Sequence, residues 1–389
     1  MKIYVFPPWY PKNELDRESS YFKEQVEALS ERGHEVTVIN IKAISVSRIG
    51  KQKMITKNVW QDGNVKTINY EVIIPIVGKL NKLQDKYISD IYYKIIKNQI
   101  DDDIANGLKA PDIMHAHFSH CCAYYCLKAK EKLNIPLVVT EHYSGLLLGT
   151  ATDNDYKRVK KTIEQSDAFI FVGTNLQKKV CDKLDVKKNT YFIPNLVDTG
   201  NFYINENKQN EDEFHFLSAC GLKKNKSIDL VIRAFHNTFS KEEKVNLLIA
   251  GDGVEREKLE NLVKEFDETD RIKFFGRYSK EQSKEIFADA DAFVLTSEVE
   301  TFGIVYIEAL SSGVPCIATK GQGAEDIIDD SNGIKVEYGN LDELSNAMRY
   351  IYENHDKFDK KKLREDCINR FSKDTICKQI EEVYQKVLN

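Results

Sequence analysis

Two glutamates eight positions apart, Glu300 and Glu308, have the spacing in this chain that most clearly suggests chemistry. The apolar run that ends at Leu295 predicts a strand, and the segment between Gly303 and Gly313 predicts a helix. The free N–H groups and partial positive charge of a helix N-terminus favour a bound phosphate. Glu300 precedes that terminus, and Glu308 lies about 7–8 Å along the axis. With this spacing, one carboxylate could bind a sugar and the other a ribose, with a diphosphate between them at the helix N-terminus. The alternative is that both glutamates are solvated residues on the protein surface.

Histidines follow two of the predicted strands. His142 comes after the apolar run 136–140, and His115 and His117 end an earlier run. These histidines could simply be buried polar residues whose hydrogen bonds are made within the protein. Alternatively, His115 and His117 could hold a metal ion. The cysteines at 121, 122 and 126 allow the same two interpretations, and we expect reduced, buried thiols and no metal ion.

Strand and helix patterns alternate through nearly all of the chain, which is typical of parallel sheets with helical crossovers. Ligands bind such sheets at the carboxyl ends of their strands. The predicted strands are 2–6, 36–39, 111–115, 136–140, 168–172 and 191–193 in a first series, and 214–219, 245–250, 272–275, 292–295 and 314–318 in a second.

The two series predict two Rossmann-like, doubly wound α/β domains that face a cleft. The first domain covers residues 1–198 and the second 214–372, because the polar, Asn- and Glu-rich stretch 199–213 is typical of a linker. The amphipathic segment 373–389 predicts a last helix, which could belong to either domain; we assign it to the first.

Composition and charge indicate the cellular location of the protein and its possible contact with a membrane. No apolar stretch reaches the roughly 18 residues that a membrane-spanning helix needs. The apolar start 1–6 is too short for a signal peptide, so we expect a cytoplasmic protein. The stretch from Lys42 to Lys57 has no acid, and the stretch from Lys79 to Lys97 combines lysines with an apolar stripe. Both could meet an anionic membrane face, or they could be a solvated loop and a core helix.

The segment from Ser297 to Leu310 resembles the signature of glycosyltransferase family 4, in which two glutamates flank seven residues. Glu300 and Glu308 stand in the two Glu positions. Further segments resemble landmarks of that family in the same order: 9–11, 22–25, 33–36, 115–117, 140–142, 193–198, 250–253 and 308–315.

The resemblance implies a GT-B fold and transfer of a sugar from a nucleoside-diphosphate sugar to an acceptor hydroxyl. It implies that the anomeric configuration is retained and that no metal or other cofactor is needed. Glu300 would face the donor sugar, Glu308 the ribose and Lys226 the diphosphate. His142 would face the donor sugar as a catalytic residue.

The resemblance also assigns residues around this centre, and the chain departs from the family at three places. Ser19 stands where the family often has Gly, Gly221 where it often has Arg, and Gln322-Gly323 where it has two glycines. We expect Lys224 to supply the cation that the Arg would bring. The further donor-side residues are Thr301, Phe302, Gly303, Asn195 and Gly251, and the acceptor side has Ser19 and His117.

The sequence therefore predicts a glycosyltransferase of bacterial cell-surface polysaccharide or glycoconjugate synthesis. Its partners would be a nucleotide-sugar and a saccharide or lipid-linked saccharide, with no nucleic acid. A sugar-nucleotide epimerase of the same fold and a non-catalytic binding protein are the alternatives. The sugar, the base and the acceptor are left open.

Overall fold

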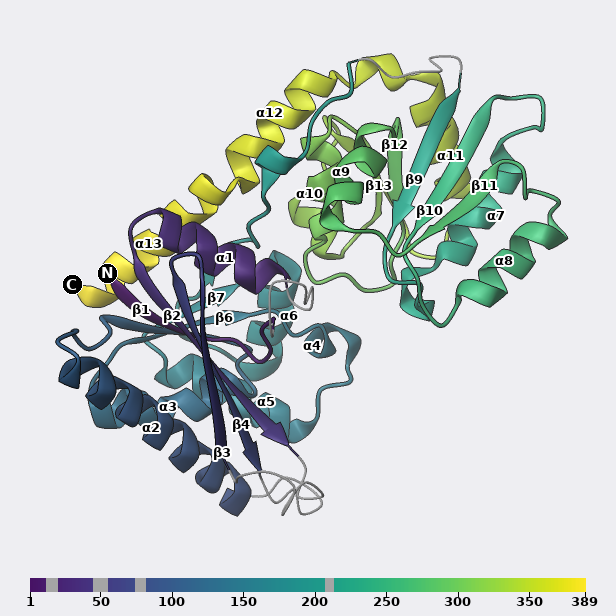
Figure 1. Ribbon diagram of the computed structural model, residues 1–389. Coiled ribbons are helices and arrows are strands. Elements are labelled where there is room, and N and C mark those ends of the chain that lie inside the picture. The colour runs from purple at the N-terminus through teal and green to yellow at the C-terminus, as the bar shows by residue number, and fades with distance from the viewer. Residues whose placement is uncertain (12–19, 45–54, 74–81, 207–212) are drawn as a thin grey trace. The chain divides into compact units, whose positions relative to one another are not determined.

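A computed structural model describes residues 1–11, 20–44, 55–73, 82–206 and 213–389. The chain divides into two compact units. Unit 1 comprises Met1–Leu196 and Ile376–Asn389, and unit 2 comprises Val197–Thr375. Each unit has a single sheet with helices on both of its faces (Figure 1).

The sheet of unit 1 has the order β3-β4-β2-β1-β5-β6-β7-β8, and every pairing but one is parallel. The chain runs from β1 to β2 on one side and returns to place β5 on the other side of β1. The order therefore reverses between β1 and β5, which is where such sheets bind ligands. The strands are β1 (Lys2–Phe6), β2 (Glu35–Ile44), β3 (Ile55–Asp62), β4 (Val65–Ile73), β5 (Ile113–His117), β6 (Leu137–Glu141), β7 (Ala168–Phe171) and β8 (Tyr191–Phe192).

A hairpin forms one edge of this sheet and corrects the expectation of wholly parallel strands. β3 runs antiparallel to β4, and Asp62 pairs with Val65. Gly63 in the turn has a φ of +55°, a conformation that glycine adopts at little cost. The Asp62-Gly63 pair is a hairpin signal that the sequence analysis missed.

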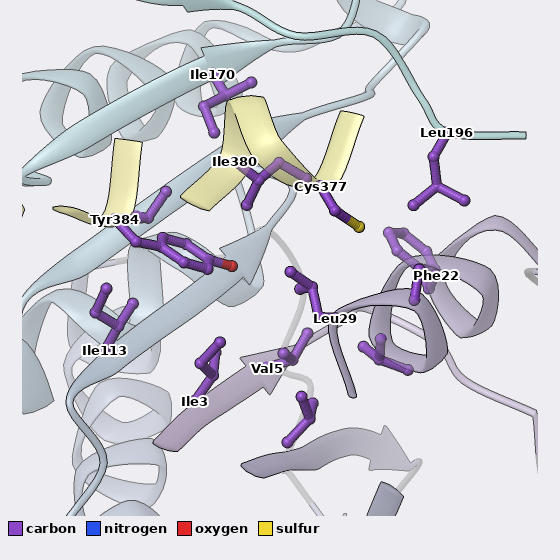
Figure 2. Packing of buried hydrophobic residues seen from close by; sticks show 14 of the residues in the cluster. Ile3, Val5, Phe22, Leu29, Ile113, Ile170, Leu196, Cys377, Ile380 and Tyr384 are labelled. Carbon is purple, nitrogen blue, oxygen red and sulfur yellow. The ribbon is translucent and has the colours of Figure 1, made fainter. Parts of the chain in front are cut away.

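Two helical layers cover the sheet of unit 1 (Figure 1). Apolar residues from β1, α1 and the C-terminal helix α13 pack against the sheet and close one face. Figure 2 shows Ile380 and Tyr384 of α13 directed toward the same core as Ile113 and Ile170. The segment 376–389 thus completes the core of unit 1. The helices are α1 (Ser20–Glu31), α2 (Lys82–Ala105), α3 (Cys122–Leu133), α4 (Gly145–Leu148), α5 (Asp153–Gln165), α6 (Thr174–Leu184) and α13 (Lys373–Leu388).

Unit 2 has a six-stranded parallel sheet of order β11-β10-β9-β12-β13-β14. The order reverses between β9 and β12. Helices α7, α8 and α11 cover one face, and α9, α10 and α12 the other (Figure 1). The strands are β9 (Phe214–Ala219), β10 (Val245–Ala250), β11 (Ile272–Gly276), β12 (Ala292–Leu295), β13 (Cys316–Thr319) and β14 (Gly333–Val336). The helices are α7 (Ile228–Thr238), α8 (Arg256–Glu265), α9 (Lys280–Ala288), α10 (Ile304–Ser311), α11 (Leu341–Glu353) and α12 (Lys360–Phe371), with 3-10 turns at Thr199–Asn201, Lys224–Lys226, Gly323–Asp326 and His355–Lys357.

The predicted linker 199–213 is in large part a piece of unit 2. Thr199–Asn201 form a 3-10 turn, and Phe202 is buried with its ring 5.8 Å from that of Phe287. One aromatic anchor in a polar stretch is a weak sequence signal, which explains the error. Residues 207–212 of that stretch lie outside the described part of the chain.

Candidate active site

An ion pair lies at the carboxyl edge of the sheet in unit 2. Lys226 ends the 3-10 turn after β9, and Glu300 lies in the loop after β12. Their Nζ and Oε2 atoms are 2.6 Å apart, and the side chains are 20% and 17% exposed. Because β9 and β12 flank the point where the strand order reverses, the pair lies where a doubly wound sheet binds its ligands.

Backbone and amide contacts hold the two loops together. The Glu298 N–H donates to the Asn225 carbonyl oxygen at 2.9 Å, which joins the loops directly. The Thr301 N–H donates to Glu300 Oε1 at 3.2 Å, and the Glu300 N–H points to the amide oxygen of Gln322 at 3.4 Å. Gln322, at the place where the family has glycine, thus helps to position the glutamate.

Two glycines allow the backbone to approach at this edge. A Cβ on Gly303, whose φ is +96°, would lie 2.6 Å from the ring of Tyr306. A Cβ on Gly323 would lie 2.4 Å from the backbone nitrogen of Phe302. The Tyr306 hydroxyl donates to the Leu295 carbonyl oxygen at 2.6 Å, which fixes the start of α10 to the end of β12. The predicted helix start after Gly303 is therefore present, and the Phe302 side chain is buried as a packing residue.

Glu308 lies on α10, and its charge acts on Tyr278 in the loop after β11. Burial raises the pKa of Tyr278, and the nearby charge of Glu308 adds to the effect. Burial also raises the pKa of the Cys220 thiol to about 12. Gly251 has a φ of +129°, and a Cβ there would lie 1.8 Å from the Cys220 carbonyl oxygen. The expected donor-side residues therefore lie on separate elements near Tyr278: Gly251 in the loop after β10, and Glu308 on α10.

Lys224, which we expect to replace the family Arg, lies beside this centre, and Lys223 is its neighbour in the same loop. Lys223 and Lys224 are exposed and line a groove of about 290 Å³ with Glu298 and Tyr338. Gly221 has an ordinary φ, and nothing lies within 4 Å of a Cβ built on it. A longer side chain at position 221 would therefore begin in open space.

The carboxyl edge of the sheet in unit 1 holds a cluster of histidines. His117 Nδ1 and His142 Nε2 are 3.0 Å apart, and the rings of His115 and His117 stack with centroids 4.7 Å apart. His115 is bound on both nitrogens, by the Tyr384 hydroxyl at 2.6 Å and the Thr140 hydroxyl at 2.8 Å. His115 is therefore a support, and His117 connects it to His142.

These histidines are neutral at physiological pH. Burial lowers the pKa of His115 and of His142 to about 3, and it lowers the pKa of His117 well below its usual value. The cluster can donate and accept hydrogen bonds, but it does not supply a positive charge. Asn195, predicted on the donor side, belongs to unit 1 and lies close enough to His142 to oppose part of this lowering of its pKa. Ser19 lies outside the described residues.

Glu141, which belongs to the family-like segment 140–142, is a functional candidate that the sequence did not reveal. Glu141 is fully buried, and its carboxylate accepts hydrogen bonds from two loops. The adjacent glutamate and histidine at a strand end were the available signal.

The described residues of both units include no group of three or more His, Cys, Asp or Glu side chains arranged to hold a metal ion. The eight cysteines are all free thiols. None of the described helices combines the length and apolar character needed to cross a membrane.

Comparisons with known proteins agree with this geometry. The family Glycosyltransferase Family 4 matches residues 19–201, and the family Glycosyl transferases group 1 matches residues 201–374. The chain is 26% identical over 289 residues to N-acetyl-alpha-D-glucosaminyl L-malate synthase of Bacillus anthracis, which covers 71% of this chain and 75% of the relative. It is 26% identical over 284 residues to the gpi3 subunit of the phosphatidylinositol N-acetylglucosaminyltransferase of Schizosaccharomyces pombe, covering 71% and 61%.

Solved structures share the fold along the whole chain. Sucrose-phosphate synthase from Thermosynechococcus elongatus aligns with a TM-score of 0.75 at 19% identity, covering 100% of this chain and 99% of the other. Alr3699/HepE of Anabaena, solved with UDP and glucose, aligns with a TM-score of 0.72 at 18% identity, covering 99% and 100%.

The chain has two doubly wound units, each with polar residues near its switch point, and this is the GT-B fold. Within that fold class, the chain belongs to glycosyltransferase family 4 and is a glycosyltransferase.

Proposed function

We propose that this glycosyltransferase transfers a sugar from a nucleoside-diphosphate sugar to an acceptor hydroxyl and retains the anomeric configuration. The observation that carries the proposal is the Lys226–Glu300 pair, at the switch point of unit 2 and just before the N-terminus of α10. A fixed cation and free helix N–H groups suit a diphosphate. A related fold, that of Alr3699/HepE, has been solved with UDP and glucose, which supports this class of donor.

The chemistry assigns a task to each charge. The acceptor oxygen forms a bond to the anomeric carbon on the face that the diphosphate leaves, and the acceptor proton passes to the departing diphosphate. Lys226 stabilises the negative charge that grows on that leaving group. Glu300 binds the sugar and Glu308 the ribose, and neither needs a metal ion. Lys224 is the proposed second cation.

His142 contributes in a different way. Because burial lowers its pKa to about 3, it is a neutral hydrogen-bonding group at pH 7. We assign it to the hydroxyl groups of the donor sugar, and His117 and Ser19 to the acceptor side. The pH dependence of turnover between pH 6 and 8 should therefore lack a His142 titration.

The cellular task we propose is synthesis of a bacterial surface polysaccharide or glycoconjugate at the inner face of the membrane. The first turns of α2 support membrane contact, because Leu83 is 77% and Tyr87 44% exposed beside the exposed Lys86. Ile91 and Ile95, which continue the predicted stripe, are buried in the core. The stretches 45–54 and 74–81 of the predicted basic surface lie outside the described residues.

A thermal-shift panel of UDP, GDP, ADP and their sugars, followed by a transfer assay, tests the proposal. The cognate nucleotide at 100 times its dissociation constant should stabilise the protein by about 2.7 kcal/mol. Product that forms with no acceptor present would indicate an epimerase. Absence of any nucleotide stabilisation would contradict the proposed donor class.

A further inference from the structure

We propose that Glu141 is a positioning residue that joins the loops after β5 and β6 and so holds the ring of His142 in one orientation and one tautomer. The inference rests on the proposed role of His142 in the transfer. It concerns unit 1 alone, and Glu141 acts through its neighbour without touching the substrate.

Both oxygens of the Glu141 carboxylate accept hydrogen bonds, one from each of two loops. Oε1 accepts the N–H groups of His142 at 2.9 Å and Tyr143 at 2.8 Å. Oε2 accepts the N–H of Ser119 at 3.0 Å and also its hydroxyl. A carboxylate that is 0% exposed is tolerated only when such donors replace water. Since all four donors are protein groups, Glu141 is not placed to act as a catalytic base.

The loop after β5 is held in an unusual conformation next to this carboxylate. Phe118 has a φ of +64°, which is rare for a bulky residue and is seen where surrounding contacts enforce it. The Phe118 N–H donates to the Thr140 carbonyl oxygen at 3.0 Å, and the next residue, Ser119, is bound by Glu141. The Ser119 carbonyl oxygen accepts from the Thr162 hydroxyl of α5 at 2.8 Å, which anchors the loop to a helix.

This conformation lays the Phe118 ring on the imidazole of His142. The two rings stack with centroids 5.6 Å apart at an angle of 22°. Phe22 meets His142 edge-on at 5.4 Å, and Tyr21 lies at 5.3 Å. The ring is therefore enclosed by aromatic side chains, and release of Phe118 would remove one wall.

The hydrogen bonds of His142 leave one nitrogen for a ligand. Nε2 is engaged by His117, and both imidazoles are neutral, so a single proton lies between them. His142 Nδ1 is buried, and none of the described residues meets the geometry of a hydrogen bond with it, although the Asn195 side chain lies close enough to the imidazole to raise its pKa in part. The tautomer of His142 is thus coupled to His117, and it holds only while the ring keeps its orientation.

The test is a Glu141→Gln substitution in two backgrounds. A glutamine can still accept from His142 and Tyr143, but its NH₂ group then faces the Ser119 N–H, and the loop after β5 is released. We expect turnover to fall at least tenfold in the parent and to change less than twofold in a His142→Ala background. An equal fall in both backgrounds would overturn the proposal.

Asp103→Asn is the matched control. Asp103 is another buried carboxylate of unit 1, bonded to Lys2, Tyr4 and Gln99 at the opposite edge of the sheet. Measured well below the unfolding temperature, this variant should keep turnover within twofold of the parent. A fall equal to that of Glu141→Gln would mean that any buried carboxylate of the unit matters alike, and the proposal fails.

A readout without transfer separates this inference from the proposed function. Histidine nitrogen–proton NMR spectra, assigned with the His142→Ala variant, should show one neutral tautomer of His142 in the parent. In Glu141→Gln we expect two exchanging forms, whether or not the correct donor is known. An unchanged His142 pattern overturns the proposal. If Glu141→Gln fails to fold, Ser119→Ala removes one donor to the carboxylate, and the same spectral change is required of it.

Discussion

The carboxyl edges of the two sheets differ in charge although their strands are arranged alike. In both units the strand order reverses inside the sheet, between β1 and β5 or between β9 and β12, and the loops at or next to that point carry the candidate site residues. Unit 2 places a cation and a carboxylate there, each partly exposed. Unit 1 places His117 at the end of β5 and His142 after the neighbouring strand β6, and both side chains are buried and uncharged.

The difference suggests that the two units, although similarly folded, bind different parts of the substrates. A diphosphate brings about two negative charges and needs a fixed cation and N–H groups. Sugar hydroxyls are neutral and need oriented hydrogen-bonding groups in a place without water. The carboxylate that unit 1 has at this edge, Glu141, is fully buried and accepts hydrogen bonds from protein N–H groups. A second buried charge in unit 1, the ion pair of Lys2 and Asp103, lies at the amino ends of the strands.

The largest effect should come from breaking the charged edge. Lys226→Ala should lower turnover by about a hundredfold or more, because it removes the cation that we propose stabilises the leaving group. Glu300→Gln should lower turnover at least tenfold, yet its affinity for nucleoside diphosphate should stay the same or rise, because glutamine competes less for Lys226. Calorimetric titration and a transfer assay measure the two quantities.

Lys241→Ala is the control for these variants. Lys241 pairs with Asp267 and precedes β10, at the opposite edge of the same sheet. It should change neither quantity. Parent-level turnover in folded Lys226→Ala protein would show that the charged edge is not the reaction centre.

A smaller effect tests the buried ion pair of Lys2 and Asp103 at the amino ends of the strands in unit 1. Burial alone would raise the pKa of Asp103, but hydrogen bonds from Lys2, Tyr4 and Gln99 lower it to about 2. A lowered pKa means stability that is present above pH 4 and lost as the pH falls toward 2. Asp103→Asn should therefore lower the free energy of unfolding by about 2 kcal/mol at pH 7. The gap between variant and parent should shrink in urea titrations at pH 3, and a constant gap would contradict the assignment.

The next effect concerns the second cation, because Gly221 stands where the family often has Arg and Lys224 is proposed to replace it. Because Gly221 opens into free space, Gly221→Arg should fit and should bind nucleoside diphosphate about tenfold more tightly. The double variant Lys223→Ala/Lys224→Ala should bind at least tenfold more weakly, and Gly221→Arg should restore it. Equilibrium titration with the cognate diphosphate measures all four proteins. A double variant within twofold of the parent would exclude both lysines as the second cation.

Periodicity located most strands of both sheets, and the strands β9, β10 and β12 begin and end at the predicted residues. It did so because buried parallel strands are continuous apolar runs. The strands β3 and β4 escaped notice because a hairpin at a sheet edge alternates polar and apolar residues, and β3 is largely exposed. The short strand β14 was missed as well.

Some residues of the candidate site could likewise be predicted from the sequence, and others could not. Residue type and motif spacing indicated Glu300 and Lys226, and the structure brings these two together. The roles of Glu141 and Gln322 depend on which loops meet at a sheet edge, and a single sequence does not specify such contacts. Burial of His117 and His142 could not be read from the sequence either, since it depends on aromatic side chains from α1 and the loop after β5.

The smallest effect asks whether unit 1 also differs from unit 2 in meeting a membrane. Leu83, at the start of α2, is 77% exposed, and the exposed Lys86 lies one turn on. Inserting a leucine partly into lipid gains about 1 kcal/mol, so Leu83→Ser should weaken binding to anionic phosphatidylglycerol vesicles about fivefold. Leu108→Ser is the matched control, since Leu108 is 45% exposed and follows the other end of a helix about 36 Å long. Sedimentation at low and high salt measures the binding, which salt should weaken because lysines attract the anionic surface. Equal losses in the two variants, or no binding to anionic vesicles by the parent, would show that the start of α2 is not a membrane-binding surface.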